Sequence, residues 1–121
     1  MQIHESAEDY LEKILMLREQ NGLVRSIDIA NAMGYSKPSI SIAMKHLREN
    51  GFITMDGENH IYLTESGSAI ATRIYDRHQT LTRYLVKLGV PQEIAERDAC
   101  KVEHDLSPES YDALRNHLRS F

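Results

Sequence analysis

The sequence has a single cysteine, Cys100, among its 121 residues, so an internal disulfide framework is excluded. No apolar run approaches the roughly 18–20 residues needed to span a bilayer. The first six residues lack the basic stretch and apolar core of a secretory signal. Low-complexity segments and internal repeats are also absent. Together these absences predict no membrane partner and a reducing, cytoplasmic location.

Positive charge is also scarce, because 14 Lys and Arg stand against 18 Asp and Glu, a formal net charge of -4. A DNA-binding surface is basic, so this balance argues against nucleic-acid binding unless basic residues cluster locally or something removes negative charge. What is present is a hydrophobic fraction of 41%, which supports a real core. The length suits one ordinary domain, or a small domain with an appendage.

The hydrophobic periodicity predicts a mainly α protein. We expect, in chain order, helices over 5–20, 27–33 and 36–49, a hairpin of 52–55 with 60–63, and helices over 65–88, 91–104 and 108 to the C-terminus. The expected helix caps are Ser26, Ser36, Thr64 and Ser107. A boundary is expected within 71–75, inside the long helix, dividing the chain into residues 1–72 and 73–121.

Residues 26–63 have the order of a winged helix-turn-helix, with a short helix, a tight turn, a second helix and a hairpin wing. The expected buried face of the second helix is Ile40, Ala43, Met44 and Leu47. Its opposite face offers hydroxyls, an apolar tip and a cation, a mixture suited to the major groove. Arg25 and Ser26, at the start of the short helix over 27–33, suit contacts with DNA phosphate groups. The predicted DNA-binding residues are therefore Arg25, Ser26, Ser36, Lys37, Pro38, Ser39, Ser41, Ile42 and Lys45.

A simpler explanation of this face also exists. Lys45 and Arg48 would then be a solvated helix surface, and Ile42 would pack against a neighbouring element. The added wing favours DNA binding, because the whole element is stronger evidence than any one of its residues.

A second constellation lies near the end of the fifth helix, where Cys100, Glu103 and His104 are spaced i, i+3 and i+4. On one helix face a thiolate, a carboxylate and an imidazole would converge, which suits a transition metal better than a core. Glu96, one turn before Cys100, is a candidate ancillary ligand.

Three further residues extend this constellation. Asp9 and Glu12 form an i, i+3 acid pair on the first helix, and His78 lies in the apolar stripe of the long helix. Alone, the acids would be solvated surface, His78 a hydrogen-bonded core residue, and Cys100 a small buried hydrophobe. Taken together they indicate a metal site, although the sequence does not show that these helices meet.

On these motifs the chain resembles, over essentially its whole length, the diphtheria toxin repressor / manganese transport regulator family of metal-dependent repressors. The matching motifs are Glu8-Asp9-Tyr10-Leu11-Glu12, Ser36-Lys37-Pro38-Ser39-Ile40-Ser41, Leu63-Thr64-Glu65-Ser66-Gly67, Arg77-His78 and Cys100-x-x-Glu103-His104. The resemblance implies a winged helix-turn-helix DNA-binding domain, residues 1–72, followed by a helical metal-binding and dimerisation domain, residues 73–121. It also implies a homodimer on a palindromic double-stranded DNA operator.

The resemblance implies the metal ligands Asp9, Glu12, His78, Cys100, Glu103 and His104. Asp9 and Glu12 match manganese-type members, whereas Cys100 matches iron-type members and stands where the manganese type has Glu. Iron-type members have Met in place of Asp9, and Thr82 and Glu96 stand where they have Glu and His ancillary ligands. The predicted cofactor is Fe²⁺ or Mn²⁺, with the thiolate favouring Fe²⁺ and with Co²⁺, Ni²⁺ or Zn²⁺ as substitutes.

The sequence thus predicts a metal-responsive transcriptional repressor of metal homeostasis, not an enzyme. One alternative is a winged-helix regulator not gated by metal, in which Cys100 and His78 are structural. The other is a helical-bundle metalloenzyme, but that class uses paired Glu-x-x-His motifs, and only the single Glu103-His104 is present.

Overall fold

The structure, a computed structural model, describes residues 5–120. Residues 1–4, on which the expected lack of a secretory signal partly rests, and residue 121 lie outside the described residues. The chain divides between Thr72 and Arg73, inside its long helix, into two compact units. In the part of the chain that is described, no helix is both long and apolar enough to cross a membrane.

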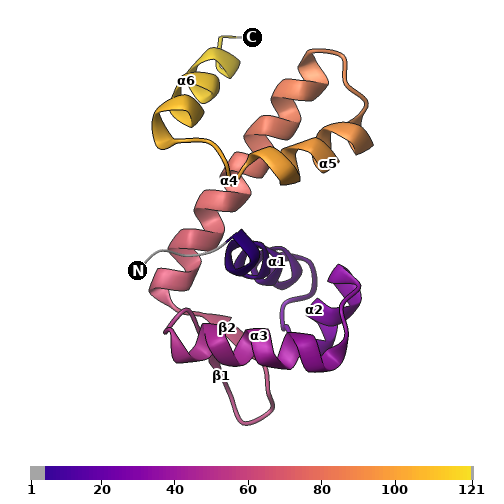
Figure 1. Ribbon diagram of the computed structural model, residues 1–121, viewed down its shortest axis with the longest axis vertical. Coiled ribbons are helices and arrows are strands. Elements are labelled where there is room, and N and C mark those ends of the chain that lie inside the picture. Colours follow the sequence, from indigo (N-terminus) through magenta and orange to yellow (C-terminus); the bar gives the residue numbers. More distant parts are fainter. Residues whose placement is uncertain (1–4, 121) are drawn as a thin grey trace. The chain divides into compact units, whose positions relative to one another are not determined.

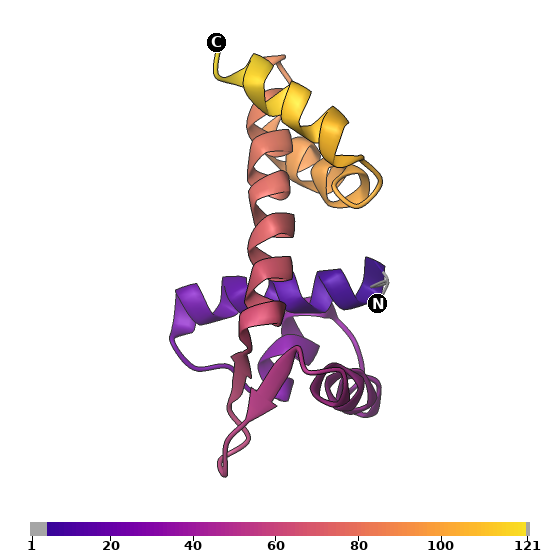
Figure 2. The same cartoon turned by 90° about the vertical axis from the view of Figure 1, so that its left-hand side faces the viewer.

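The N-terminal unit consists of three helices and a two-stranded antiparallel sheet, and the first turns of the long helix complete it (Figure 1). Its elements are α1 (Glu5–Asn21), α2 (Ser26–Met33), α3 (Lys37–Glu49), β1 (Ile53–Met55), β2 (Ile61–Leu63) and the start of α4 (Glu65–Lys87). Thr54 pairs with Tyr62 in the register of the sheet. The loop of the hairpin projects away from α1 (Figure 2). This is the predicted order of a winged helix-turn-helix, and the predicted mainly α fold is confirmed.

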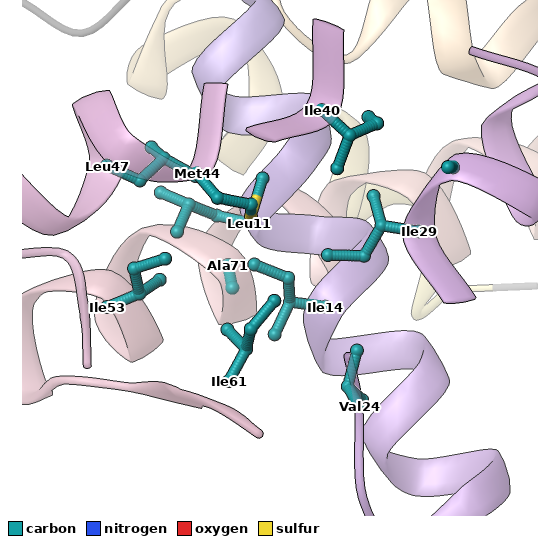
Figure 3. Packing of buried hydrophobic residues seen from close by; sticks show 11 residues of the cluster. Leu11, Ile14, Val24, Ile29, Ile40, Met44, Leu47, Ile53, Ile61 and Ala71 are labelled. Carbon is teal, nitrogen blue, oxygen red and sulfur yellow. The ribbon is translucent and has the colours of Figure 1, made fainter. Parts of the chain in front are cut away.

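The core of this unit is a cluster of apolar side chains to which every one of its elements contributes (Figure 3). The predicted buried face of α3 is confirmed at Ile40, Met44 and Leu47, and Ala43 packs partly buried beside them. The other buried members of the cluster are Leu11, Ile14, Val24, Ile29, Ala30, Ile53, Ile61 and Ala71. Burial of this apolar surface holds α3 and the hairpin in fixed relation, which any DNA-reading surface requires.

Local signals define the ends of the helices. Gly34 ends α2 with φ 71°, a left-handed conformation that glycine adopts without strain. Ser36 caps α3 as predicted, accepting a hydrogen bond from the Ser39 backbone N–H at 3.3 Å. The predicted cap of α2 is wrong by one residue. Arg25, not Ser26, is the N-cap, and its backbone N–H donates to the Asp28 carboxylate at 2.9 Å.

The hairpin is joined to α4 at close range. The Thr64 hydroxyl donates to the Gly51 carbonyl oxygen at 2.7 Å and accepts from the Gly67 backbone N–H at 3.2 Å, so the predicted cap is confirmed. A Cβ atom at Gly67 would overlap the carbonyl oxygen of Phe52, so only glycine fits there.

The C-terminal unit contains the rest of α4, then α5 (Gln92–Val102) and α6 (Pro108–Leu118). Ser107 caps α6 as predicted, because its hydroxyl accepts from the Ser110 backbone N–H at 3.1 Å. The predicted fifth helix is too long, since α5 ends at Val102 rather than at residue 104. That difference changes the geometry of the predicted metal ligands.

Candidate metal centre

Three predicted ligands meet in the C-terminal unit. The Nδ1 atom of His78, on α4, lies 3.0 Å from Oε2 of Glu103 and 3.6 Å from Sγ of Cys100. One nitrogen, one sulfur and one oxygen atom of these three side chains all lie within 4.8 Å of one another. His78 is therefore not a simple core histidine, and Cys100 is exposed rather than a buried hydrophobe.

Glu103 and His104 lie just beyond the last residue of α5, whereas the prediction placed both within that helix. Glu103 is the C-cap of α5, with its backbone N–H bonded to the Ala99 carbonyl oxygen, and His104 lies in the turn that follows. In this turn Nε2 of His104 lies 3.5 Å from Oε1 of Glu103. Since Oε2 faces His78, the Glu103 carboxylate stands between two imidazoles, one before and one after it in the chain.

The electrostatics of this group favour a cation. The hydrogen bonds of His78 to Cys100 and then to Glu103 raise its pKa to about 10, well above its usual 6.5, so the group retains a proton at neutral pH. A divalent metal would compete with that proton for the same donor atoms. A donor set of sulfur, nitrogen and oxygen suits Fe²⁺ and the later divalent metals, with the carboxylate and imidazole also acceptable to Mn²⁺.

Arg77, the neighbour of His78 on α4, holds the turn that carries the ligands. One of its terminal nitrogens donates to the carbonyl oxygens of Glu103 at 3.1 Å and Leu106 at 2.8 Å. Its guanidinium carbon lies 5.1 Å from the ring centroid of Tyr111 on α6. The sequence predicted Arg77 only as part of a family motif. The structure shows that it fixes the chain on both sides of His104.

The remaining predicted ligands belong to α1 and to an earlier turn of α5. Asp9 and Glu12 are one turn apart on α1, in the N-terminal unit. Glu96 is exposed and accepts a hydrogen bond from the Gln92 amide at 2.9 Å. The roles of all three as ligands stay predictions.

The predicted DNA-binding residues lie at the surface of the N-terminal unit. Ile42 exposes 60% of its surface, so it does not pack against a neighbouring element of that unit. Of the hydroxyls, those of Ser36 and Ser39 are engaged with each other at 2.9 Å in the cap. The other predicted residues of this surface are exposed or half-buried: Arg25, Ser26, Lys37, Pro38, Ser41 and Lys45.

Arg48 is not among the predicted DNA-binding residues, but its position next to them is informative. With Ser26, Ser41 and Lys45 it lines a shallow hollow that also reaches Met55 on the wing. Its spacing of seven residues from Ser41 and three from Lys45 was the available signal. Four of the six Lys and Arg in residues 1–72 are Arg25, Lys37, Lys45 and Arg48. Two of these cations, Lys45 and Arg48, line the same hollow, which is the kind of local cluster that DNA binding requires.

Comparison with known proteins places this geometry in a family. Residues 2–61 match the family described as "Iron dependent repressor, N-terminal DNA binding domain". Residues 64–121 match "Iron dependent repressor, metal binding and dimerisation domain". The chain therefore belongs to the iron-dependent repressors, a family of metal-dependent winged-helix transcriptional regulators, and it is not an enzyme.

Individual relatives agree. The transcriptional regulator MntR of Escherichia coli O157:H7 is 38% identical over 111 residues, covering 92% of this chain and 72% of the relative. An uncharacterised helix-turn-helix regulator of Methanocaldococcus jannaschii is 33% identical over 119 residues, which covers 97% of this chain and 95% of that regulator. MntR of Bacillus subtilis is 32% identical over 116 residues, covering 96% and 82%.

Solved structures share the fold. A manganese-dependent transcriptional repressor in complex with manganese superposes with a TM-score of 0.84 at 27% identity, covering 93% of this chain and 52% of that one. The manganese regulator SloR gives 0.82 at 26% identity, covering 98% and 55%. The chain spans about half the length of these solved chains. The predicted family, fold and class of metal-dependent DNA-binding repressor are confirmed.

Proposed function

We propose that this chain is a homodimeric repressor that acts in the cytoplasm on a palindromic DNA operator and controls metal homeostasis. In this proposal its affinity for DNA depends on a divalent metal bound by His78, Cys100, Glu103 and His104. The observation that carries the proposal is the Glu103 carboxylate between two imidazoles, with a thiol 3.6 Å from one of them. The metal would supply two positive charges to this acidic and polar group.

Asp9 and Glu12 complete the proposed ligand set from α1. Without a cation, these two carboxylates and that of Glu103 repel one another, which disfavours their approach. With the charge neutralised, the winged helix is held in one relation to the dimerisation domain. The two DNA-binding domains of a homodimer are then held at the spacing of two half-sites, which is about one helical turn of DNA or a multiple of it.

DNA affinity with and without metal tests this function. An operator is first selected from random duplexes with the metal-loaded protein, and its binding is then measured in Mn²⁺, in anaerobic Fe²⁺ and in EDTA. We expect metal to strengthen operator binding at least ten-fold, and His78→Ala to remove the effect. Asp98→Ala, an exposed acid of α5, is the matched control and should respond as the wild type does. Equal operator affinity in metal and in EDTA would remove the proposal.

We further propose that Cys100 favours Fe²⁺, with Mn²⁺ close behind. The thiol supports iron, because Mn²⁺ prefers oxygen ligands. The names of relatives such as the manganese regulator SloR support manganese. Cys100→Glu should weaken activation by Fe²⁺ relative to Mn²⁺. An unchanged ratio of the two activation constants would show that Cys100 does not set the preference.

A further inference from the structure

The C-terminal unit has a polar hollow, formed by α4 and α6. Its volume is about 430 Å³, within the range of roughly 300–1,000 Å³ typical of small-molecule sites. The lining residues are Thr80, Arg83, Lys87, Arg115, Leu118 and Arg119. All of them belong to the same compact unit, and none is a proposed ligand of the metal.

Helical spacing explains why these side chains gather. Thr80, Arg83 and Lys87 are at i, i+3 and i+7 on α4, and Arg115 and Arg119 are at i and i+4 at the end of α6. Cations in the last turn of a helix are commonly explained by the helix dipole. That explanation covers Lys87 and Arg115 singly. It does not cover Arg83 in the body of α4, nor the convergence of four cations on one hollow.

Three of the four cations of the hollow are arginines without an ion pair in the described part of the chain. Residues 73–121 carry eight Lys and Arg and eight Asp and Glu, and half of those cations line this one hollow. Among residues 5–120, no carboxylate forms an ion pair with Arg83, Arg115 or Arg119. A smaller hollow shares Thr80, Arg83 and Arg115, and it adds one acid, Asp76.

Hydroxyl groups complete the lining. The Tyr111 hydroxyl, which lines the smaller hollow, lies 3.1 Å from the Thr80 hydroxyl, which lines both. Either hydroxyl can turn its proton toward a bound oxygen atom. Arginine presents a planar fork of donors that matches phosphate, and lysine adds a point charge. The chemistry is that of a site for a compact, multiply charged oxyanion.

We propose that this hollow between α4 and α6 binds a phosphate group, either as free phosphate or as part of a small phosphorylated metabolite. Arg83 and Arg115, which line both hollows, are its principal donors. The site is separate from the metal ligands, so the chain would respond to a second, anionic signal. This inference does not depend on the proposed metal response.

Calorimetric titration of the full, metal-free chain with inorganic phosphate and with adenosine diphosphate tests the proposal. Ionic strength is kept constant with sodium chloride, so that general screening is equal throughout. We expect saturable binding of one anion per chain, weakened about ten-fold by Arg83→Gln and by Arg115→Gln. Arg97→Gln, an exposed arginine of α5, removes the same charge elsewhere and should leave the affinity within two-fold.

The two probes distinguish the source of the phosphate. Tighter binding of the diphosphate assigns the site to a phosphorylated metabolite, and equal or tighter binding of phosphate assigns it to the free ion. An absence of saturable binding by both probes overturns the proposal, as does equal weakening by Arg97→Gln. Loss of non-specific DNA binding in Arg83→Gln, with phosphate affinity unchanged, would instead assign the hollow to the DNA backbone.

Discussion

The two compact units of this chain are stabilised by different means. In the N-terminal unit, buried apolar side chains from α1, α2, α3, the start of α4 and both strands form one cluster. In the C-terminal unit fewer apolar residues are buried, and polar contacts join its helices. These contacts are Arg77 with the turn after α5, Thr80 with Tyr111, and Tyr84 with His117 at 2.6 Å.

The two units also differ in their balance of charge. Residues 1–72 carry six Lys and Arg against ten Asp and Glu, whereas residues 73–121 carry eight of each. The N-terminal unit therefore has fixed hydrophobic packing and an unbalanced charge. The C-terminal unit has a balanced charge and fewer buried apolar residues. A ligand that binds charged groups should change the stability of the second unit more than that of the first, since its contacts involve those groups.

The largest expected effect is in the apolar core. Ile40→Ala removes a fully buried side chain of α3 and should lower the free energy of unfolding of the N-terminal unit by about 2–5 kcal/mol. The loss should be the same with and without metal. Urea unfolding followed by amide signals of each unit measures it. A loss shared equally by the C-terminal unit would show that the two units unfold as one.

A smaller loss is expected at Arg77. Arg77→Ala removes the donor to the Glu103 and Leu106 carbonyl oxygens, and hydrogen bonds to charged groups contribute roughly 1.5–3 kcal/mol. Metal affinity should fall by about 10–100-fold, as it does when residues that orient ligands are changed. The absorption spectrum of bound Co²⁺ should shift as well. Arg77→Lys keeps one donor and should recover part of the affinity. Unchanged metal affinity in Arg77→Ala would show that the turn is held by other contacts.

The next effect depends on pH. The pKa of His78 is raised to about 10 by Cys100 and Glu103, so its interactions stabilise the metal-free C-terminal unit fully below its usual pKa of 6.5. That stability is lost as the pH rises through 10. Metal affinity should change in the opposite sense, increasing with pH up to about ten-fold per unit as the proton becomes easier to displace. Urea midpoints and metal titrations from pH 6 to 10 measure both, with His78→Gln as the variant in which both changes should be smaller.

Most of the fold could be predicted from the sequence, because its signals are local. Gly34 marks the end of α2, and Ser36, Thr64 and Ser107 mark the starts of α3, α4 and α6, as predicted. The spacing of its apolar residues predicted the buried face of α3. The cap of α2 was misplaced because Ser26 is a good cap by type. Arg25 is the N-cap instead, and its backbone N–H donates a hydrogen bond to the Asp28 carboxylate.

The residue types of the metal site were predictable, and so was the approach of Cys100 to Glu103, but the turn that carries His104 was not. The pattern Cys100-x-x-Glu103-His104 identified the residue types, yet a single helix face was assumed for all three. The structure ends α5 at Val102, and Arg77 on another helix holds the following turn. The two hydrogen bonds of Arg77 reach carbonyl groups that are 26 and 29 positions further along the chain, and no local sequence pattern reveals such contacts.

The smallest effect on stability is expected at Ile42, which is on the same helix as Ile40 but 60% exposed. Ile42→Ala should change the free energy of unfolding by less than about 0.5 kcal/mol, as surface substitutions usually do. It is therefore the matched control for Ile40→Ala. Operator binding should respond differently, because an apolar tip on the outer face of α3 suits the methyl group of thymine. Replacing thymine by uracil in the selected operator should weaken binding by the wild type and have less effect on Ile42→Ala. Equal sensitivity of both proteins to uracil would assign Ile42 to another role.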